Sequence, residues 1–344
     1  MFEASCKNSG SISEYSIVMQ NQGPIDAVIT WVDGNEPSHK KKMHQYLKDF
    51  TYIPEFVAGS TRYNSVGEIF FCIASILRFA PFIRKIFIVT DNQTPPIDEF
   101  IQKNFPLNKI TITIVDHTVI FKGYEQFLPT FNSLSIETCL FRIPDLSENF
   151  VYFNDDVFLI RPTKPTDFFV DNNIVAHGDW RSIFFDQLLS LIKPKKNGHK
   201  RFGFKDGMIR AAKTLGISPY YFHLDHTPHP QKKELLEQFY SKNPEIFLKN
   251  ISYRFRNSAQ FNPQALSYML GFKTGKSIKK KETRYLYLKP IGRENGYINR
   301  KLKLYNKNPQ INFCCINSID LATEKDRTIL FDWLKKLLNV TIEI

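Results

Sequence analysis

Two adjacent acids interrupt a run of apolar residues in the stretch VYFNDDVFLI, from Val151 to Ile160. Such a run is typical of a buried strand, yet Asp155 and Asp156 stand side by side in its middle. Adjacent carboxylates repel each other, and burying either one without a partner costs roughly several kcal/mol. A bivalent cation would remove both penalties, and so would a turn that leaves both acids in water. The stretch alone leaves both explanations open.

Acidic side chains also follow three other predicted strands at the point where each strand ends. These strands cover Ile25–Val32, Lys85–Asn92 and Lys109–His117, and the acids are Asp33, Asp91 and Asp116. Helices are predicted at Val66–Phe79 and Ser133–Phe141, and Pro37 can open another. Alternating strands and helices predict a parallel sheet, whose ligands lie outside the carboxyl ends of the strands. The pattern therefore predicts an acidic rim, although any one of these aspartates alone would be an ordinary turn residue.

The second half of the chain is predicted to be largely helical. Amphipathic helices are expected at Lys205–Gly216, Gln231–Pro244 and Asp326–Asn339, the last with Asp326 as a candidate N-cap. No repeat or low-complexity linker divides the chain. We expect a polar leader over residues 1–24 and one composite domain over residues 25–340. Its α/β part covers about 25–170, and a helical, basic part covers about 171–340.

The composition is that of a globular protein in a reducing compartment. Of 344 residues, 42% are hydrophobic and 23% are charged. Five cysteines, an odd number without CxxC spacing, indicate neither a disulfide framework nor a zinc site. The leader lacks the pattern of a secretory signal, and the apolar stretch Ile69–Ile83 is broken by Arg78 and Pro81 and is too short to span a bilayer. A soluble, cytoplasmic protein is expected.

The net charge is +12, from 46 basic and 34 acidic residues. Lysines cluster at Lys193–Arg201 and Lys273–Lys281. Such charge suits nucleic acid, anionic lipid or phosphorylated substrates, or forms a solvated surface. No nucleic-acid recognition motif accompanies it, so nucleic acid is not expected as a partner.

Four blocks of polar residues resemble, in the same order, those of the Stealth family of sugar-1-phosphate transferases. They are DAVITWVDG; RYNSVGEI with VTDNQ; LPTFNSLSIE with YFNDDVF; and HLDHTPHP, YRFRNSAQFNP and FCCIN. Bacterial members polymerise phosphodiester-linked capsules, and the Golgi N-acetylglucosamine-1-phosphotransferase shares the segments. The resemblance covers roughly Ile25–Asn317. It implies a Rossmann-like, nucleotide-sugar-binding α/β fold with helices on both faces of a mostly parallel sheet.

The resemblance also implies the reaction and a metal. An acceptor hydroxyl attacks the sugar-linked phosphorus of a nucleotide-diphosphate sugar, expected to be a UDP-sugar, and the nucleoside monophosphate leaves. The acceptor is a saccharide or a growing polysaccharide, with a peripheral contact at the inner membrane. Asp155 and Asp156 are suitable ligands for Mg²⁺ or Mn²⁺. Because neighbours in a strand point to opposite faces, we expect the strand to end at Asn154, or one acid alone to bind metal.

The remaining site residues are carried over from the matching blocks. Asp33 is expected to hold the ribose or base of the nucleotide or to act as general base, unless it only forms an Asx-turn. Arg62 is expected to pair with a phosphate oxygen. Glu68 is expected to hold the acceptor hydroxyl or to position Arg62. Asp91, Asn92 and Trp31 belong to the nucleotide pocket. The set is completed by Asn132, Ser133 and Glu137, by His226 as base or phosphate ligand, by Arg256 as a phosphate clamp, and by Asn317. Asn132 and Ser133 also suit a helix cap; His223, His229 and Arg254 are weaker candidates.

The chain departs from the family pattern at four positions. Phe70 and Ala74 replace frequent arginines, Ser318 replaces an acid after Asn317, and Gln260 stands where an acid is frequent. These departures leave fine specificity and full activity open. A conventional metal-dependent glycosyltransferase releasing a nucleoside diphosphate is the first alternative, although its acid pair usually has one residue between the carboxylates. A non-catalytic polyanion-binding protein is the second.

Overall fold

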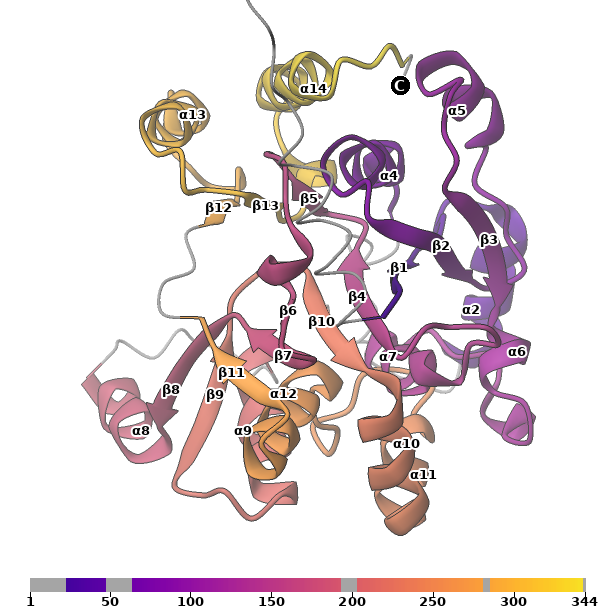
Figure 1. Ribbon diagram of the computed structural model, residues 1–344, viewed down its shortest axis with the longest axis vertical. Helices are drawn as coiled ribbons and strands as arrows, with labels where there is room; N and C mark the ends of the chain where they lie inside the picture. The colour runs from indigo at the N-terminus through magenta and orange to yellow at the C-terminus, as the bar shows by residue number, and fades with distance from the viewer. Residues whose placement is uncertain (1–22, 48–63, 193–202, 281–284, 343–344) are drawn as a thin grey trace, which may run out of the picture.

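The computed structural model describes residues 23–47, 64–192, 203–280 and 285–342 (Figure 1). Its main sheet has the order β10-β4-β1-β2-β3. The strands are β1 (Ile25–Thr30), β2 (Ile83–Thr90), β3 (Thr111–Asp116), β4 (Asn149–Asn154) and β10 (His229–Lys232). The first four are parallel, and β10 joins β4 in the antiparallel sense. The carboxyl ends of four strands therefore share one edge, as predicted.

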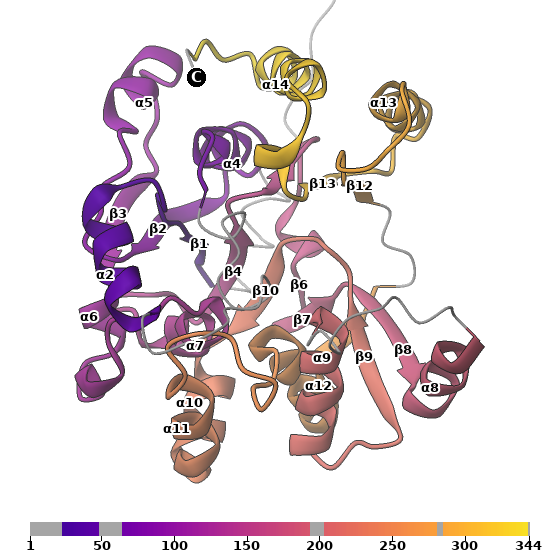
Figure 2. The same cartoon turned by 180° about the vertical axis from the view of Figure 1, so that it is seen from behind.

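Buried, β-branched runs explain the central strands. Strand β1 reads IDAVIT and is buried almost throughout, and β4 is buried from Asn149 to Phe153. A strand that is apolar on both sides must be covered on both sides. Figures 1 and 2 show α4 and α14 on one side of the sheet and α7, α10 and α11 on the other. The predicted α/β class is confirmed.

The helices connect the strands and cover the sheet. In chain order they are α2 (Pro37–Leu47), α4 (Glu68–Phe79), α5 (Asp98–Asn104), α6 (His117–Ile120), α7 (Ser133–Cys139), α8 (Ile183–Ile192), α9 (Phe204–Thr214), α10 (Lys233–Lys242), α11 (Pro244–Ile251), α12 (Pro263–Thr274), α13 (Tyr297–Lys307) and α14 (Glu324–Leu338). Among the described residues no helix is both long and apolar enough to cross a membrane.

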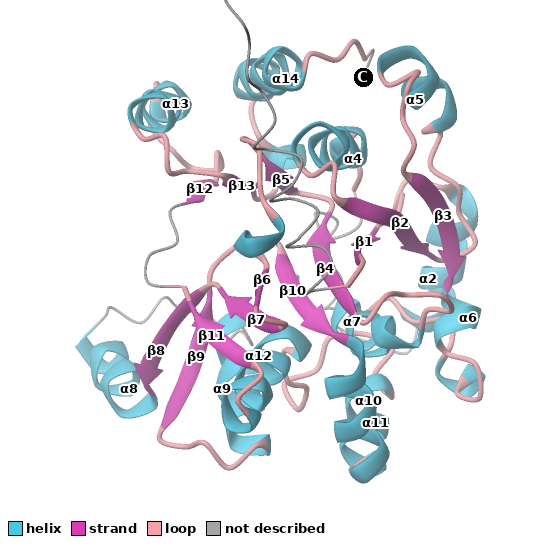
Figure 3. Ribbon diagram, in the orientation of Figure 1, coloured by secondary structure: helices cyan, strands magenta, loops and turns pink. Residues whose placement is uncertain are grey.

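Smaller sheets extend the fold (Figure 3). Strands β11 (Ser277–Lys279), β7 (Asn173–Ala176) and β6 (Phe169–Val170) form one sheet; β12 (Tyr285–Leu288), β13 (Phe313–Ile316) and β5 (Val157–Leu159) form another; and β8 (Gly178–Ser182) pairs with β9 (Tyr220–Leu224). The C-terminal half thus adds several strands to its predicted helices.

The predicted strand around the adjacent acids is two strands in two sheets. Strand β4 ends at Asn154 in the main sheet, as expected, and β5 begins at Val157 and pairs with β13. The turn between them consists of Asp155 and Asp156. The predicted N-cap of the last helix is wrong, because Thr323 caps α14 by accepting a hydrogen bond from the N–H of Asp326. A capping residue precedes the first turn, and Asp326 already lies within it.

An ion pair between a buried carboxylate and an exposed arginine joins the amino ends of the central strands. The carboxylate of Asp26 is fully buried and accepts bonds from Arg84 Nε at 2.9 Å and Nη2 at 2.6 Å. It also accepts a bond of 2.7 Å from the N–H of Ser147, just before β4. Asp26 of β1 thereby binds both neighbouring strands, β2 through Arg84 and β4 through Ser147.

We predict that Arg84→Ala lowers the unfolding free energy by about 3 kcal/mol, because it leaves the Asp26 charge buried without its partner. Urea unfolding measures the change. Arg300→Ala is the control, since the pair of Arg300 with Glu294 is exposed and its loss should cost less than about 1 kcal/mol. Equal effects of the two substitutions would contradict the prediction.

Candidate active site

Three carboxylates influence one another at the carboxyl edge of β4. Asp155 and Asp156 form the turn after β4, and Glu68 begins α4 and is 6% exposed. Burial, and then the charges of Asp156 and Asp320, raise the pKa of Glu68 to about 7. Burial and the charges of Glu68 and Asp156 raise the pKa of Asp155, and burial raises that of Asp156 to about 6. The rim is therefore an electrostatically unfavourable cluster of acids.

The donor set fits a magnesium or manganese ion that shares its shell with a substrate. Among the described residues no group of three His, Cys, Asp or Glu side chains could by itself hold a metal ion. Magnesium is usually bound through one or two carboxylates, with waters and substrate phosphates completing its shell. Asp155 and Asp156 provide this kind of partial shell, and their raised pKa values show that cationic charge would be favourable here.

Two antiparallel pairings bring distant segments to these acids. In the first, β10 begins at His229 opposite Tyr152 of β4, so the preceding loop with His226 lies at the carboxyl end of β4. In the second, Cys315 of β13 pairs with Val157, and the N–H of Ile316 donates to the Asp156 carbonyl at 3.0 Å. The loop with His226 and the segment with Asn317 therefore both lead to the end of β4 that carries Asp155.

His226 lies between two aromatic rings. Its imidazole stacks on Phe204 with ring centroids 5.2 Å apart and on Tyr287 at 4.7 Å. Burial lowers the pKa of His226, which favours the neutral ring at neutral pH. Burial, together with the charges of Cys315 and Asp156, raises the pKa of Tyr287 to about 12. Tyr287 therefore contacts the His226 ring and is influenced by the charge of Asp156.

Arg256 belongs to another wall of the site, at the start of α7. Its Nη2 donates to Ser133 Oγ at 2.5 Å. Helices that follow parallel strands begin at the carboxyl edge of the sheet, so Ser133 lies on the same edge as the acids. Glu137 lies one turn along α7, and burial raises its pKa. The charge of Arg256 and hydrogen bonds with Gln264, Ser133 and Tyr152 oppose that rise. Tyr152 in turn donates to Asn154 Oδ1 at 2.6 Å.

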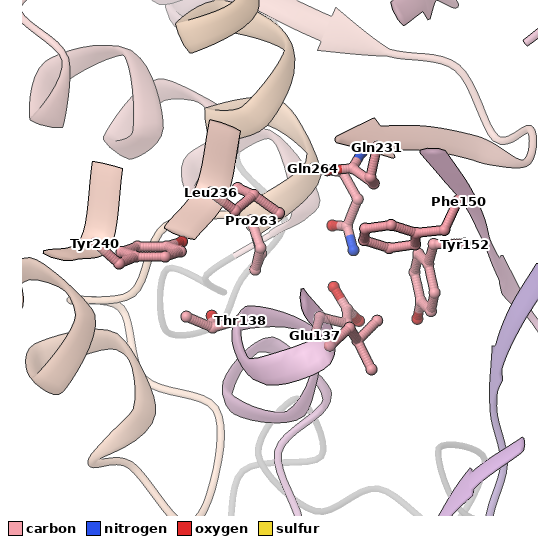
Figure 4. A pocket seen from close by; sticks show the side chains of 10 residues that line it. Glu137, Thr138, Phe150, Tyr152, Gln231, Leu236, Tyr240, Pro263 and Gln264 are labelled. Atoms are coloured by element: carbon pink, nitrogen blue, oxygen red, sulfur yellow. The ribbon is translucent and has the colours of Figure 1, made fainter. Parts of the chain in front are cut away.

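Glu137 reaches Arg256 but has little room for a ligand. Figure 4 shows its carboxylate pointing toward Gln264 in a pocket that Phe150 and Tyr152 also line. The cavity measures about 10 Å³, enough for about one water molecule. Ligand pockets usually exceed about 300 Å³. The arrangement therefore makes Glu137 a residue that positions Arg256 and Tyr152.

Asn132 is a buried structural residue. Its side chain caps α7 by accepting from the N–H of Leu134, and its Nδ2 donates to Tyr253 O at 2.9 Å and to Gln260 Oε1 at 2.8 Å. Gln260 Nε2 donates to Ser135 Oγ at 3.1 Å and to Asn250 O at 2.7 Å. Asn132 therefore orders the start of α7 and the segment before α12.

The predicted nucleotide-pocket residues lie after β1 and β2. Asp33 Oδ1 accepts from the N–H of Asn35 at 2.8 Å, so it does form an Asx-turn. Trp31 is nearly buried and donates its indole N–H to Ser65 Oγ at 3.2 Å. Asp91 binds Lys42 at 2.8 Å, and Asn92 has a φ of 53°. Asp33 and Asn92 remain at the edge, whereas Asp91 is engaged by α2.

Several predicted residues stand elsewhere or are not described. Arg62 and the cluster Lys193–Arg201 lie outside the described residues. Arg254 is engaged by the carbonyls of Pro129 and Gln126 and lies over the Tyr46 ring. In the second lysine cluster, Lys279 pairs with Asp179 and Lys280 with Asp167.

Sequence reasoning missed Tyr152, Tyr287, Phe204 and Asp320. Tyr152 carried a signal, because residues two apart on a strand share a face and Tyr152 precedes Asn154 by two. Asp320 accepts from Asn64 Nδ2 at 3.2 Å and carried no local signal. Beside it an open hollow of about 180 Å³ lies between the starts of α13 and α14, lined among others by Leu321, Arg293 and Lys325.

A parallel sheet with an acidic rim at its carboxyl edge defines an α/β protein whose ligand lies at that edge. Residues 23–51 match the model of Stealth protein CR1, conserved region 1, and residues 62–177 match Stealth protein CR2, conserved region 2. The capsular polysaccharide phosphotransferase of Actinobacillus suis is 33% identical over 307 residues, covering 87% of this chain and 78% of that protein. The chain belongs to the Stealth family, as the sequence motifs predicted.

A second curated relative agrees with this assignment. The capsular polysaccharide phosphotransferase cps1A of Actinobacillus pleuropneumoniae is 32% identical over 315 residues, covering 90% of this chain and 80% of that protein. Among solved structures, the galactosyltransferase LgtC in complex with donor and acceptor sugar analogs aligns with a TM-score of 0.44 and 12% identity, over 93% of this chain and 97% of that chain. The relatives' names favour neither of the two alternative functions.

The Asp91 ion pair should make stability fall in acid. Burial opposes ionisation of Asp91, but hydrogen bonds from His39 and Lys42 hold its pKa at about 2, below the usual value of 3.8. A lowered carboxyl pKa stabilises the fold above the unfolded value, and this stabilisation is lost as pH falls from about 4 to 2.

We predict that Asp91→Asn lowers the unfolding free energy by about 1 kcal/mol at pH 7, allowing for solvent screening, and by much less near pH 2. Urea titrations at several pH values measure the difference. Glu99→Gln, an exposed acid of α5, should change little at either pH. A difference for Asp91→Asn that stays constant with pH would refute the role of this charge.

Proposed function

We propose that this protein transfers a sugar-1-phosphate from a nucleotide-diphosphate sugar to a hydroxyl of a saccharide acceptor. The acceptor oxygen forms a bond to the sugar-linked phosphorus, the bond from that phosphorus to the bridging oxygen breaks, and a nucleoside monophosphate leaves. The sugar keeps its C1–O bond. The observation that carries the proposal is the convergence of His226 and Asn317 on the turn Asp155–Asp156, in a family whose relatives are named phosphotransferases.

Asp155 and Asp156 would hold Mg²⁺ or Mn²⁺ at the end of β4. When bound, the ion would neutralise charge on the donor's phosphate oxygens, which is the main requirement of phosphoryl transfer. The fixed turn between two sheets supports this role, because preorganised ligands need no rearrangement during the reaction. Glu68 adds negative charge beside them, and Asn317 offers an uncharged hydrogen-bonding group on the other side.

His226 is the general base of this proposal. Its pKa is lowered by burial, so the neutral imidazole is available to accept the proton of the attacking hydroxyl. The rings of Phe204 and Tyr287 fix its plane. Its position in the loop before β10 supports this role, because that loop approaches the end of β4 that carries the acids.

Arg256 would bind the phosphoryl oxygens from the opposite wall. Its bond to Ser133 and the nearby charge of Glu137 hold the guanidinium in place. A planar guanidinium can donate two parallel hydrogen bonds to phosphate. Glu137 thus acts through Arg256 and has no contact with substrate.

The nucleotide would lie along the ends of β1 and β2. Trp31, Asp33 and Asn92 are assigned to its base and ribose, with a uridine nucleotide as the expected donor, and Asp91 supports them through Lys42. The hollow between α13 and α14 is assigned to the acceptor, because Arg293 and Lys325 suit an anionic saccharide. The product is a surface polysaccharide such as a capsule, made in the cytoplasm at the inner membrane face.

The leaving group tests the proposed function. Incubation with a panel of nucleotide-sugars and saccharide acceptors should release nucleoside monophosphate from one donor, measured by chromatography. Release of nucleoside diphosphate would instead identify a glycosyl transfer. Binding of polyanions without any donor turnover, unchanged by Asp155→Ala, would identify a non-catalytic protein.

We predict that turnover requires a divalent ion held at the turn. EDTA should abolish monophosphate release and Mg²⁺ or Mn²⁺ should restore it. Asp155→Asn or Asp156→Asn should lower kcat on the order of 10²-fold or more, as loss of a preorganised charge does. Asp145→Asn, on the loop before β4 at the opposite edge, is the control. Full activity in chelator would disprove the metal requirement.

We predict that His226→Ala lowers kcat by roughly 10²–10⁴-fold, the usual worth of a general base, with little change in donor affinity. Arg256→Lys should also lose activity, because an ammonium cannot make the planar two-point contact. Thermal melts and donor titrations accompany the kinetics. A large loss of melting temperature with normal kcat would assign His226 a structural role only.

A further inference from the structure

Helix α8 carries large apolar side chains that face solvent. It reads IFFDQLLSLI, with Asp186, Gln187 and Ser190 as its only polar residues. Phe184 and Phe185 are each 64% exposed and Leu188 is 46% exposed, whereas Ile183 is buried and joins the helix to the body. Figures 1 and 2 show α8 at the margin of the molecule, away from the main sheet. An exposed apolar patch of this size marks an interaction surface.

The neighbouring hairpin carries two further exposed aromatic side chains. Tyr220, which pairs with Ser182 at the foot of α8, and Trp180 of β8 are both exposed. Trp180 packs its ring against Phe222 and Phe272. Tryptophan and tyrosine are enriched where proteins meet the interface of a bilayer, because their rings are apolar with a polar edge. We call Trp180, Phe184, Phe185, Leu188 and Tyr220 the α8 surface.

Basic residues surround the α8 surface. Arg181 and Lys276 are exposed, Lys205 pairs with Asp186 at 3.7 Å, and Lys279 pairs with Asp179. Apolar side chains with basic residues on neighbouring elements complement a membrane with anionic headgroups.

The length of α8 excludes a spanning role. Its ten residues extend about 15 Å at 1.5 Å per residue, against about 30 Å for the apolar core of a bilayer. We propose that the α8 surface inserts into the interface of an anionic lipid membrane, with the helix lying in the plane of that interface. The partner is the bilayer itself, recognised by apolar insertion and headgroup charge.

One ion pair and one ring contact link α8 to His226. Lys205, which pairs with α8, follows Phe204, and Phe204 stacks on His226. A membrane bound at α8 therefore lies next to the residue assigned to the acceptor hydroxyl. The acceptor class that fits is a saccharide anchored in the same bilayer. This last step rests on the proposed function, whereas membrane binding does not.

Vesicle flotation of the full chain tests the proposal. The wild type should float with phosphatidylcholine vesicles that contain phosphatidylglycerol, and much less with phosphatidylcholine alone or at high salt. The double variant Phe184→Glu/Phe185→Glu should lose binding by about tenfold or more. Leu107→Glu is the matched control, because Leu107 is 89% exposed in the loop after α5, remote from α8. Lys276→Glu should weaken binding to the anionic vesicles only.

The remaining outcomes are decisive. Thermal melts should be unchanged, since both phenylalanines are exposed. Equal vesicle binding by the wild type and the double variant would overturn the proposal. The proposal would also be overturned if light scattering showed a wild-type dimer that does not bind vesicles, while the double variant was a monomer. A second copy of the chain would then cover the α8 surface.

Activity assays separate this proposal from the proposed function. With a water-soluble acceptor the double variant should keep the wild-type kcat, and with a vesicle-anchored acceptor it should lose about tenfold in kcat/KM. If no donor is turned over, but the wild type floats with vesicles and the double variant does not, the membrane surface is supported and the proposed function fails. If a donor is turned over, but the wild type and the double variant float equally, the proposed function is supported and the membrane surface fails.

Discussion

The active centre depends on a strand that changes sheets within two residues. Strand β4 is held by β1 and β10, and β5 is held by β13 and by a bond of 3.1 Å from the N–H of Leu159 to Ser75 Oγ. Asp155 and Asp156 occupy the turn between these fixed strands. Because the backbone is held on both sides, the two acids stay in this partly buried turn; burial raises the pKa of both, and the charges of Glu68 and Asp156 raise that of Asp155 further.

The same turn explains why residues far apart in the chain form one site. Two antiparallel strands, β10 and β13, pair on either side of it, and each brings the loop at its rim-side end to the acids. Helices α4 and α7 begin at the same edge and bring Glu68 and Ser133. The site is therefore assembled by sheet topology, and its residues need no common sequence motif.

The local part of this arrangement was predictable and the non-local part was not. Alternating strands and helices predicted the parallel sheet and the acids at the ends of its strands, and the end of β4 at Asn154 was one of two arrangements expected for the adjacent acids. No pattern indicates that β10 pairs with β4, that β5 pairs with β13, or that Lys42 engages Asp91, because these contacts join segments distant in sequence. Gln260 shows the limit of comparing residues by type. Its amide accepts from Asn132 and Asn257 and donates to Ser135 and Asn250, and a carboxylate could not donate.

The protein is basic overall but acidic at the rim, and this difference affects how an anionic donor reaches the site. A net charge of +12 attracts phosphate-bearing molecules at long range. At the rim, however, Glu68, Asp155 and Asp156 would repel the donor's diphosphate, so the attraction fails at the shortest distances. Arg256 counters that repulsion from only one wall, and Glu137 beside it offsets part of its charge. A cation on the acids reverses the sign at the place where phosphate must sit, so donor and metal would bind with positive cooperativity.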